Sequence, residues 1–285
     1  MDLNSYCYLG LGFLSLILLI YVYWKIRSPR IFLLLLATIG LGFLIEAVIY
    51  NFSLSYQYYP HIIKHDPIYD SNLGAVASNA FSLPIVATFI ATFRKKWPWL
   101  LFFTGLFVGI ELLFLHLDIY KHNWWRIEYT AIGLPFYFAT AKLLYQKLSQ
   151  PLTGIWHNLL LYLNTGPILG LLHIFPIMFF NMRYYKLGWF ENTSQDTNAF
   201  ATIYYLIISF VIVMITKYHW NHKVLKYAIL PILITVITLI LSKMKILHSL
   251  VWWDKYYYIF FPIIVLLIAQ AISNRLILGP SERKT

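Results

Sequence analysis

Two glutamates lie inside long apolar stretches of the chain, where an ionisable side chain is rare and costly. Glu46 ends the apolar run 42–46, and Glu111 follows Gly109 and Ile110 in a second such run. A carboxylic acid at such depth either takes up a proton or finds a cationic or amide partner. The pattern leaves two interpretations open for both acids, a functional acid/base or ligand-binding group and a buried structural group.

Further polar side chains flank these glutamates. The spacing of seven between Glu111 and Asp118 predicts one helical face two turns long, although Asp118 also fits a solvated loop charge. Asp70 is the expected N-cap of the next helix. Lys243, from the second half of the chain, is expected either to face the acids or to extend to lipid headgroups. The candidate binding residues are Glu46, Asp70, Asn79, Glu111, His116, Asp118, Trp124, Trp125, Glu128 and Lys243.

The known short motifs of catalysis are absent from the sequence. There is no phosphate-binding Walker loop, no glycine-rich dinucleotide fingerprint, no His-Glu-x-x-His and no cysteine cluster, since Cys7 is the single cysteine. The nine histidines are scattered without the spacing of a metal site. We therefore predict no metal and no cofactor, name no catalytic residue, and leave open whether the protein is an enzyme.

The elements that position these residues follow from composition. Of the 285 residues, 60% are hydrophobic and 12% charged, against about 25% charged in soluble domains. The apolar runs approach the roughly 20 residues that cross a bilayer. The sequence therefore predicts an all-α integral membrane protein with about nine transmembrane helices, near 7–24, 31–50, 71–93, 98–118, 125–146, 153–180, 197–216, 224–242 and 251–274.

The basic residues predict the orientation of these helices. The net charge of +11 is spread over short interhelical loops, which points to the lipid bilayer as partner and away from nucleic acid. With the N-terminus outside, 14 lysines and arginines fall on the cytoplasmic side and 8 on the outer side. Because cytoplasmic loops carry the excess of basic residues, we expect N-out, C-in.

The chain also contains a repeated pattern. Tyr58-Tyr59 before Asp70-Ser71-Asn72 matches Tyr184-Tyr185 before Asp196-Thr197-Asn198 at a distance of 126 positions, and Trp124-Trp125 and Pro135 match Trp252-Trp253 and Pro262. Such landmarks indicate internal duplication. We predict a leading helix with its cytoplasmic loop (1–30) and two tandem parallel four-helix repeats (31–150 and 151–285). The Tyr-rich outer loops 51–70 and 181–196 fit membrane anchoring, or a surface on which a ligand stacks.

The stretch 31–146 resembles a group of multi-pass membrane proteins of Bacillus and Clostridium relatives, which have no settled activity. The resemblance rests on Tyr58-Tyr59-Pro60, Asp70-Ser71-Asn72-Leu73-Gly74, Ser82-Leu83-Pro84, Gly109-Ile110-Glu111 and the run 120–125. It implies a multi-pass architecture and a bacterial plasma membrane. A fainter likeness connects the acid- and Trp-bearing spans with membrane-bound lycopene cyclases.

Three kinds of function fit these patterns. The favoured one is binding or transport of a small or amphipathic molecule at an outward-facing polar site, which is built mainly from the first repeat because the second lacks the acids. The alternatives are a membrane scaffold that binds a partner, and an enzyme acting on a lipid or isoprenoid with Glu46 and Glu111 as acid and base.

Overall fold

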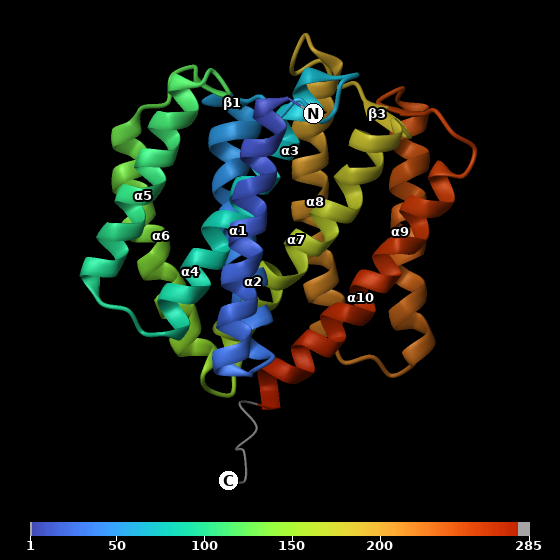
Figure 1. Cartoon of the computed structure of the whole chain (residues 1–285). Coiled ribbons are helices and arrows are strands. Elements are labelled where there is room, and N and C mark those ends of the chain that lie inside the picture. The colour runs from blue at the N-terminus through green and yellow to red at the C-terminus, as the bar shows by residue number, and fades with distance from the viewer. Residues whose placement is uncertain (1, 279–285) are drawn as a thin grey trace. The chain divides into compact units, whose positions relative to one another are not determined.

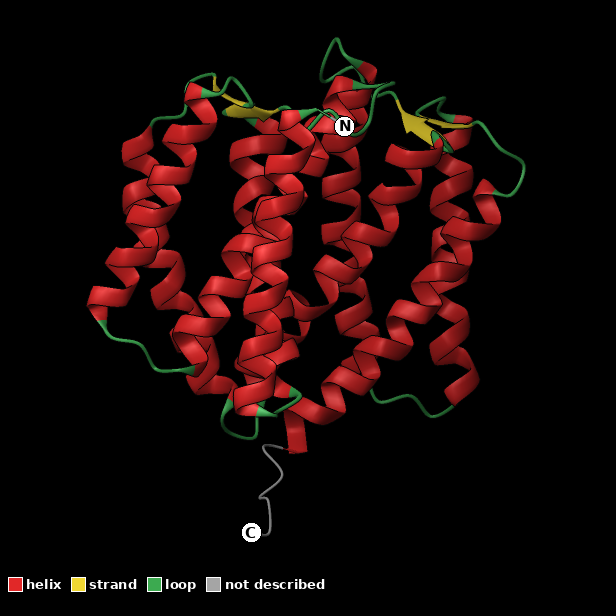
Figure 2. Ribbon diagram, in the orientation of Figure 1, coloured by secondary structure: helices red, strands yellow, loops and turns green. Residues whose placement is uncertain are grey.

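The computed structural model describes residues 2–278, and in this part of the chain nearly all of the regular structure is helical (Figures 1 and 2). The α-helices are α1 (Leu3–Ile26), α2 (Arg30–Glu46), α3 (Pro67–Val76), α4 (Leu83–Thr92), α5 (Trp97–His116), α6 (Ile127–Leu148), α7 (Gly154–Phe180), α8 (Thr193–Lys217), α9 (Lys223–Lys243) and α10 (Asp254–Leu278). Two π-helical segments, η1 (Ala47–Phe52) and η2 (Ala77–Ser82), extend α2 and join α3 to α4.

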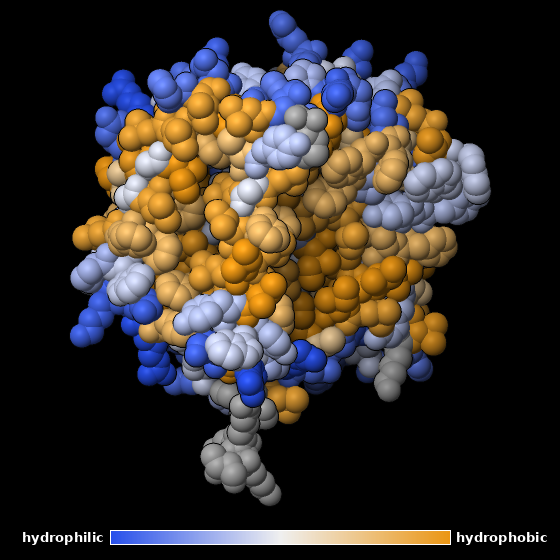
Figure 3. All heavy atoms as spheres, in the orientation of Figure 1, coloured by the Kyte–Doolittle hydropathy of each residue, from blue (hydrophilic) through white to orange (hydrophobic). Residues whose placement is uncertain are grey.

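Eight spans of the described residues are long and apolar enough to cross a membrane. The remaining long helix, α6, has the right length but carries Glu128, Lys142 and Lys147. On the face shown in Figure 3, apolar side chains cover the middle of the helices and hydrophilic ones gather at their ends. The protein is therefore a membrane-embedded, all-α protein, as the apolar runs predicted.

The chain forms two compact units, Met1–Leu152 and Thr153–Leu278. In the first unit, α4 packs against α1, α2 and α6, while α5 packs mainly against α6. The helix α1, which the sequence set apart as a leading span, thus packs within the first unit against α4 and η2. In the second unit, α7 packs against α8 and α10, and α9 packs against α10.

Each unit carries one short antiparallel strand pair at one end of its helices, a feature that the sequence did not predict (Figure 2). In the first unit β1 (Tyr56–Tyr58) pairs with β2 (Tyr120–His122), with Tyr56 opposite His122. In the second unit β3 (Arg183–Tyr185) pairs with β4 (Leu247–Ser249), with Arg183 opposite Ser249. Three residues per strand are too few for a recognisable period-two pattern, so the sequence predicts loops there.

The expected N-cap role of Asp70 is wrong. Asp66 caps α3 by accepting hydrogen bonds from the amides of Ile68 and Tyr69. Asp70, 5% exposed, instead accepts three backbone N–H bonds of 2.7–2.9 Å from residues 61–63 of the preceding loop. A carboxylate that satisfies three amides holds this loop against the start of α3.

The second unit repeats this arrangement with different loop residues. Asn192 caps α8, and Asp196 accepts three N–H bonds from residues 187–189. The next residue also matches, because the hydroxyls of Ser71 and Thr197 each accept an N–H bond of 3.0 Å, from Tyr58 and Tyr185 respectively. The structural counterpart of Tyr185 is therefore Tyr58, one position away from the alignment that the spacing of 126 predicted.

Candidate functional site

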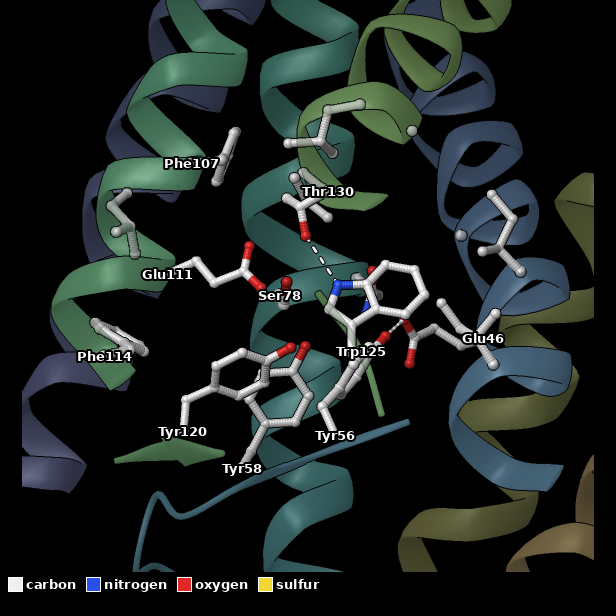
Figure 4. Close-up of a pocket in the computed structure, with 18 of the residues that line it drawn as sticks. Glu46, Tyr56, Tyr58, Ser78, Phe107, Glu111, Phe114, Tyr120, Trp125 and Thr130 are labelled. Atoms are coloured by element: carbon white, nitrogen blue, oxygen red, sulfur yellow. Dashed lines mark hydrogen bonds between the residues drawn. The ribbon is translucent and has the colours of Figure 1, made fainter. Parts of the chain in front are cut away.

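A pocket of about 200 Å³ lies inside the first unit, near the β1–β2 end of its helices (Figure 4). Its walls come from α1, α2, α4, α5, α6, both π-helical segments and both strands. Nine of its 22 lining residues are aromatic, and both intramembrane glutamates, Glu46 and Glu111, are among the others. A small, aromatic and doubly acidic cavity is the candidate functional site of the described residues.

Glu46 reaches the pocket from the junction of α2 with η1. It is 8% exposed, and its Oε1 accepts a hydrogen bond from the Tyr56 hydroxyl. Its Oε2 is buried and makes no hydrogen bond of standard geometry with the described residues. The side chain of Asn79 also interacts with this carboxylate, so neutral polar groups surround it in the pocket wall.

Asn79 belongs to η2, the π-helical segment before α4. Pro84 follows it closely, and a proline removes one amide donor and crowds the preceding turn, which widened helical turns accommodate. Asn79 is 7% exposed, and its Nδ2 also makes no hydrogen bond of standard geometry with the described residues. Asn79 interacts with the Glu46 carboxylate across the pocket wall. Both residues are associated with π-helical geometry, which is frequent at functional sites.

Glu111 approaches from α5, on another wall. Its Oε1 lies 2.7 Å from His122 Nε2, and the two side chains are 9% and 18% exposed. His122 ends β2 and lies opposite Tyr56, the partner of Glu46, in the strand register. The strand pair thus holds the hydrogen-bond partners of both acids at one register position.

Tyrosine hydroxyls line the floor of the pocket. The side chains of Tyr58 and Tyr120 point from the strands toward Glu111 and Ser78 (Figure 4). Burial raises the pKa of the Tyr56, Tyr58 and Tyr120 phenols well above their usual range, and the negative charge of Glu46 adds to the effect. These phenols therefore remain protonated and act as hydrogen-bond donors.

The strand β1 can lie this close to α3 because residue 74 is a glycine. A Cβ atom at Gly74 would lie 2.4 Å from the Cβ of Tyr58, which is closer than two side chains can approach. Glycine therefore allows Tyr58 to reach the pocket floor. On the opposite side, Trp125 donates its indole N–H to the Thr130 hydroxyl at 2.9 Å, which fixes its ring in the wall (Figure 4).

The structure brings together four of the ten candidate residues, Glu46, Asn79, Glu111 and Trp125, as pocket-lining groups. The other six lie elsewhere: Asp70 holds the loop described above, Trp124 donates to the Ser53 carbonyl at 2.6 Å, and His116, Asp118, Glu128 and Lys243 are exposed.

The predicted common face of Glu111 and Asp118 is wrong, because α5 ends at His116 and Asp118 has a left-handed φ of 55°. Lys243 ends α9 in the second unit, whereas all lining residues belong to the first. Its pairing with the acids stays a prediction.

Sequence reasoning missed the strand residues of the site. Tyr56 and Tyr58 were assigned to the Tyr-rich outer loop 51–70, Tyr120 only to the run 120–125 that carries the resemblance, and His122 to the scattered histidines. In β1 the alternation Tyr56-Gln57-Tyr58 places both tyrosines on one face of the strand, but three residues are too few for this pattern to identify a strand in the sequence. Among residues 2–278, no group of three or more His, Cys, Asp or Glu side chains is arranged to hold a metal ion.

The second unit has a buried polar cluster at its own strand pair, built around Arg183. The guanidinium donates to both carboxylate oxygens of Asp254 at 2.7 and 2.8 Å and to the Tyr185 hydroxyl at 2.9 Å. It also lies 3.4 Å from the centre of the Tyr258 ring. Burial opposes the charge of Arg183, but Tyr185 and Asp254 outweigh this effect and raise its pKa.

Tyr185 of this cluster contacts His173, which follows Glu46 by 127 positions and is its counterpart in the repeat. The Tyr185 hydroxyl lies 3.2 Å from His173 Nε2. In the sequence, Arg183 is one of the eight basic residues of the outer side. Its ion pair could not be predicted, because Asp254 lies 71 positions away.

Comparison of the chain with models of protein families, with curated proteins and with solved structures finds no match.

Proposed function

We propose that the protein binds a small molecule in the pocket of its first unit, at the outer side of a bacterial plasma membrane. The observation that carries this proposal is the cavity of about 200 Å³ into which two glutamates, from α2 and α5, project. Acids in membrane-spanning helices are rare and costly, and they mark functional sites by default. The bacterial membrane is implied by the resemblance of residues 31–146 alone.

The charges of the first unit support the proposed orientation. Among residues 2–152, the end opposite the strands carries no acidic residue and eight basic ones, Lys25, Arg27, Arg30, Arg94, Lys95, Lys96, Lys142 and Lys147. The strand end carries five acids and three basic residues. The positive-inside rule then places the strand end, and the pocket near it, outside.

We also propose that the two units arose as tandem repeats. Apart from α1 and the two π-helical segments of the first unit, both have the same order of helices and strands, with α3 and α4 corresponding to α8. Both also have a strand pair at one end, and an aspartate that binds three loop amides next to a hydroxyl that binds a strand amide. The acids of the pocket are not repeated, since His173 aligns with Glu46. The proposed binding site is therefore a property of the first unit.

A plugged pocket tests the binding proposal. Gly133 lines the pocket, and a Cβ atom there meets no other atom within 4 Å, so Gly133→Leu adds a side chain where the cavity is. Gly109 on α5 has equally open surroundings but does not line the pocket, which makes Gly109→Leu the matched control.

The assay is thermal unfolding of the purified full-length protein with choline, acetate, glycerol and hexanol as probes. A probe at 100 times its Kd stabilises the folded state by about 2.7 kcal/mol. We expect at least one probe to stabilise wild type and Gly109→Leu but not Gly133→Leu. The proposal is wrong if no probe separates Gly133→Leu from its control.

A further inference from the structure

We propose that the ligand of this pocket is a small organic cation, an amine or a quaternary ammonium group. The inference rests on the proposed binding function and specifies its chemistry. None of the 22 lining residues is a lysine or arginine, whereas two are glutamates and nine are aromatic. Aromatic faces and carboxylates both attract positive charge, and together they are the usual surroundings of bound ammonium groups.

The aromatic wall is continuous around the acids. Tyr56 packs against Trp125 with ring centres 5.4 Å apart and against Tyr120 at 5.5 Å, and Tyr120 lies 4.9 Å from Tyr58. These packed rings leave little freedom to rearrange, so their faces and hydroxyls are ordered before a ligand enters. A pre-ordered wall reduces the entropy that binding must overcome.

The position of Glu46 indicates where the positive charge would lie. Its carboxylate lines the pocket, is 8% exposed, and interacts with the neutral side chains of Tyr56 and Asn79. Neither of these side chains carries a positive charge, and none of the 22 lining residues does so as lysine or arginine. A cation next to Glu46 would compensate the charge of this buried carboxylate.

The second unit shows the same kind of site filled by its own side chain. Arg183 is the first residue of β3, as Tyr56 is the first residue of β1, and the strand registers are equivalent. Its guanidinium is held by the Asp254 carboxylate and lies over the Tyr258 ring. The second unit therefore holds the guanidinium of its own Arg183 among aromatic and acidic groups. The first unit has Tyr56 at the equivalent strand position and a cavity next to it.

The size of the cavity restricts the ligand. About 200 Å³ is below the roughly 300–1,000 Å³ of pockets for drug-sized molecules. A choline-sized cation or the ammonium part of a lipid headgroup suits this volume. Free cations and headgroups share the same chemistry, so the test includes an arm for each source.

The test measures binding of radiolabelled choline to the full-length protein in dodecyl maltoside, a detergent without amines. We expect saturable binding that tetramethylammonium displaces and that 3,3-dimethyl-1-butanol, the uncharged isostere of choline, displaces at least tenfold more weakly. Glu46→Gln should weaken choline binding at least tenfold. Glu128→Gln, which removes an exposed acid of α6, should leave the affinity unchanged.

The outcomes separate this inference from the function on which it rests. If the uncharged isostere or acetate binds as well as choline while Gly133→Leu still abolishes binding, the pocket is a binding site but the cation inference is wrong. This comparison in wild type does not depend on whether Glu46→Gln folds. If phosphatidylcholine added to the micelles lowers the apparent choline affinity, the cation comes from a headgroup, and if it does not, from solution.

Discussion

Replacing one member of the Arg183–Asp254 ion pair should lower the free energy of unfolding far more than replacing both members. The two side chains are 2% and 0% exposed, so Asp254→Ala leaves a guanidinium buried without its carboxylate, and Arg183→Met leaves the reverse. Loss of one partner of a buried ion pair costs about 3–5 kcal/mol. The double variant Arg183→Met/Asp254→Leu removes both charges, and apolar replacement of a buried pair is often close to neutral.

The remaining polar groups favour this outcome for the double variant. Tyr185 keeps its contact with His173 Nε2 at 3.2 Å, so few buried groups lose their last partner. Two independent losses would add up to about 6–10 kcal/mol, whereas we expect the double variant to lose less than about 2 kcal/mol, a coupling of several kcal/mol.

The assay is equilibrium unfolding in mixed micelles of dodecyl maltoside and SDS, followed by circular dichroism, under conditions where unfolding is reversible. Lys255→Ala, an exposed neighbour of Asp254, is the control and should change the unfolding free energy by less than about 0.5 kcal/mol. Single variants within about 1 kcal/mol of wild type would refute the buried pair. A double variant that loses the sum of the single losses would refute the coupling.

Three further predictions follow from the same contacts. Asp70→Asn should lower the unfolding free energy by about 2–4 kcal/mol, because one side-chain amide oxygen cannot replace a carboxylate that binds three amides. The control is the cap variant Asp66→Ala, which should lose about 1 kcal/mol. Unfolding in mixed micelles should therefore show the larger loss for Asp70→Asn. Tyr56→Arg should place in the first unit the cation that the second unit carries, and radiolabelled choline binding should fall at least tenfold; unchanged binding would contradict the equivalence of the two positions. In intact cells, a cysteine at position 121 in β2 should react with a membrane-impermeant maleimide and one at position 95 should not, and the reverse pattern would overturn the N-out orientation.

The helices were predictable because their signal is local. Each span is an apolar run long enough to cross a bilayer, and eight of them meet this criterion in the structure. Glu46 and Glu111 were identifiable for the same reason, since an acid stands out in an apolar run. The bounds at the ends of the helices were harder, as the end of α5 at His116 rather than at Asp118 shows.

The rest of the site depends on contacts between residues far apart in the chain. The partner of Glu111 is His122, 11 positions later and on another element, and the partner of Arg183 is Asp254, 71 positions later. No local pattern specifies such pairs. The misassigned cap had a local cue that was overlooked, because Pro67 directly after Asp66 is the usual first residue of a helix. The three-residue strands carry too little periodicity to be recognised without their partners.

The number of choline molecules bound per chain tests the central claim most directly. The acidic, aromatic cavity exists in the first unit, and Arg183 holds the corresponding position of the second. Equilibrium dialysis of the full-length protein in dodecyl maltoside should therefore give one choline per chain for wild type and Gly109→Leu, and none for Gly133→Leu. Two cholines per chain, or one that Gly133→Leu retains, would contradict a single site in the first unit.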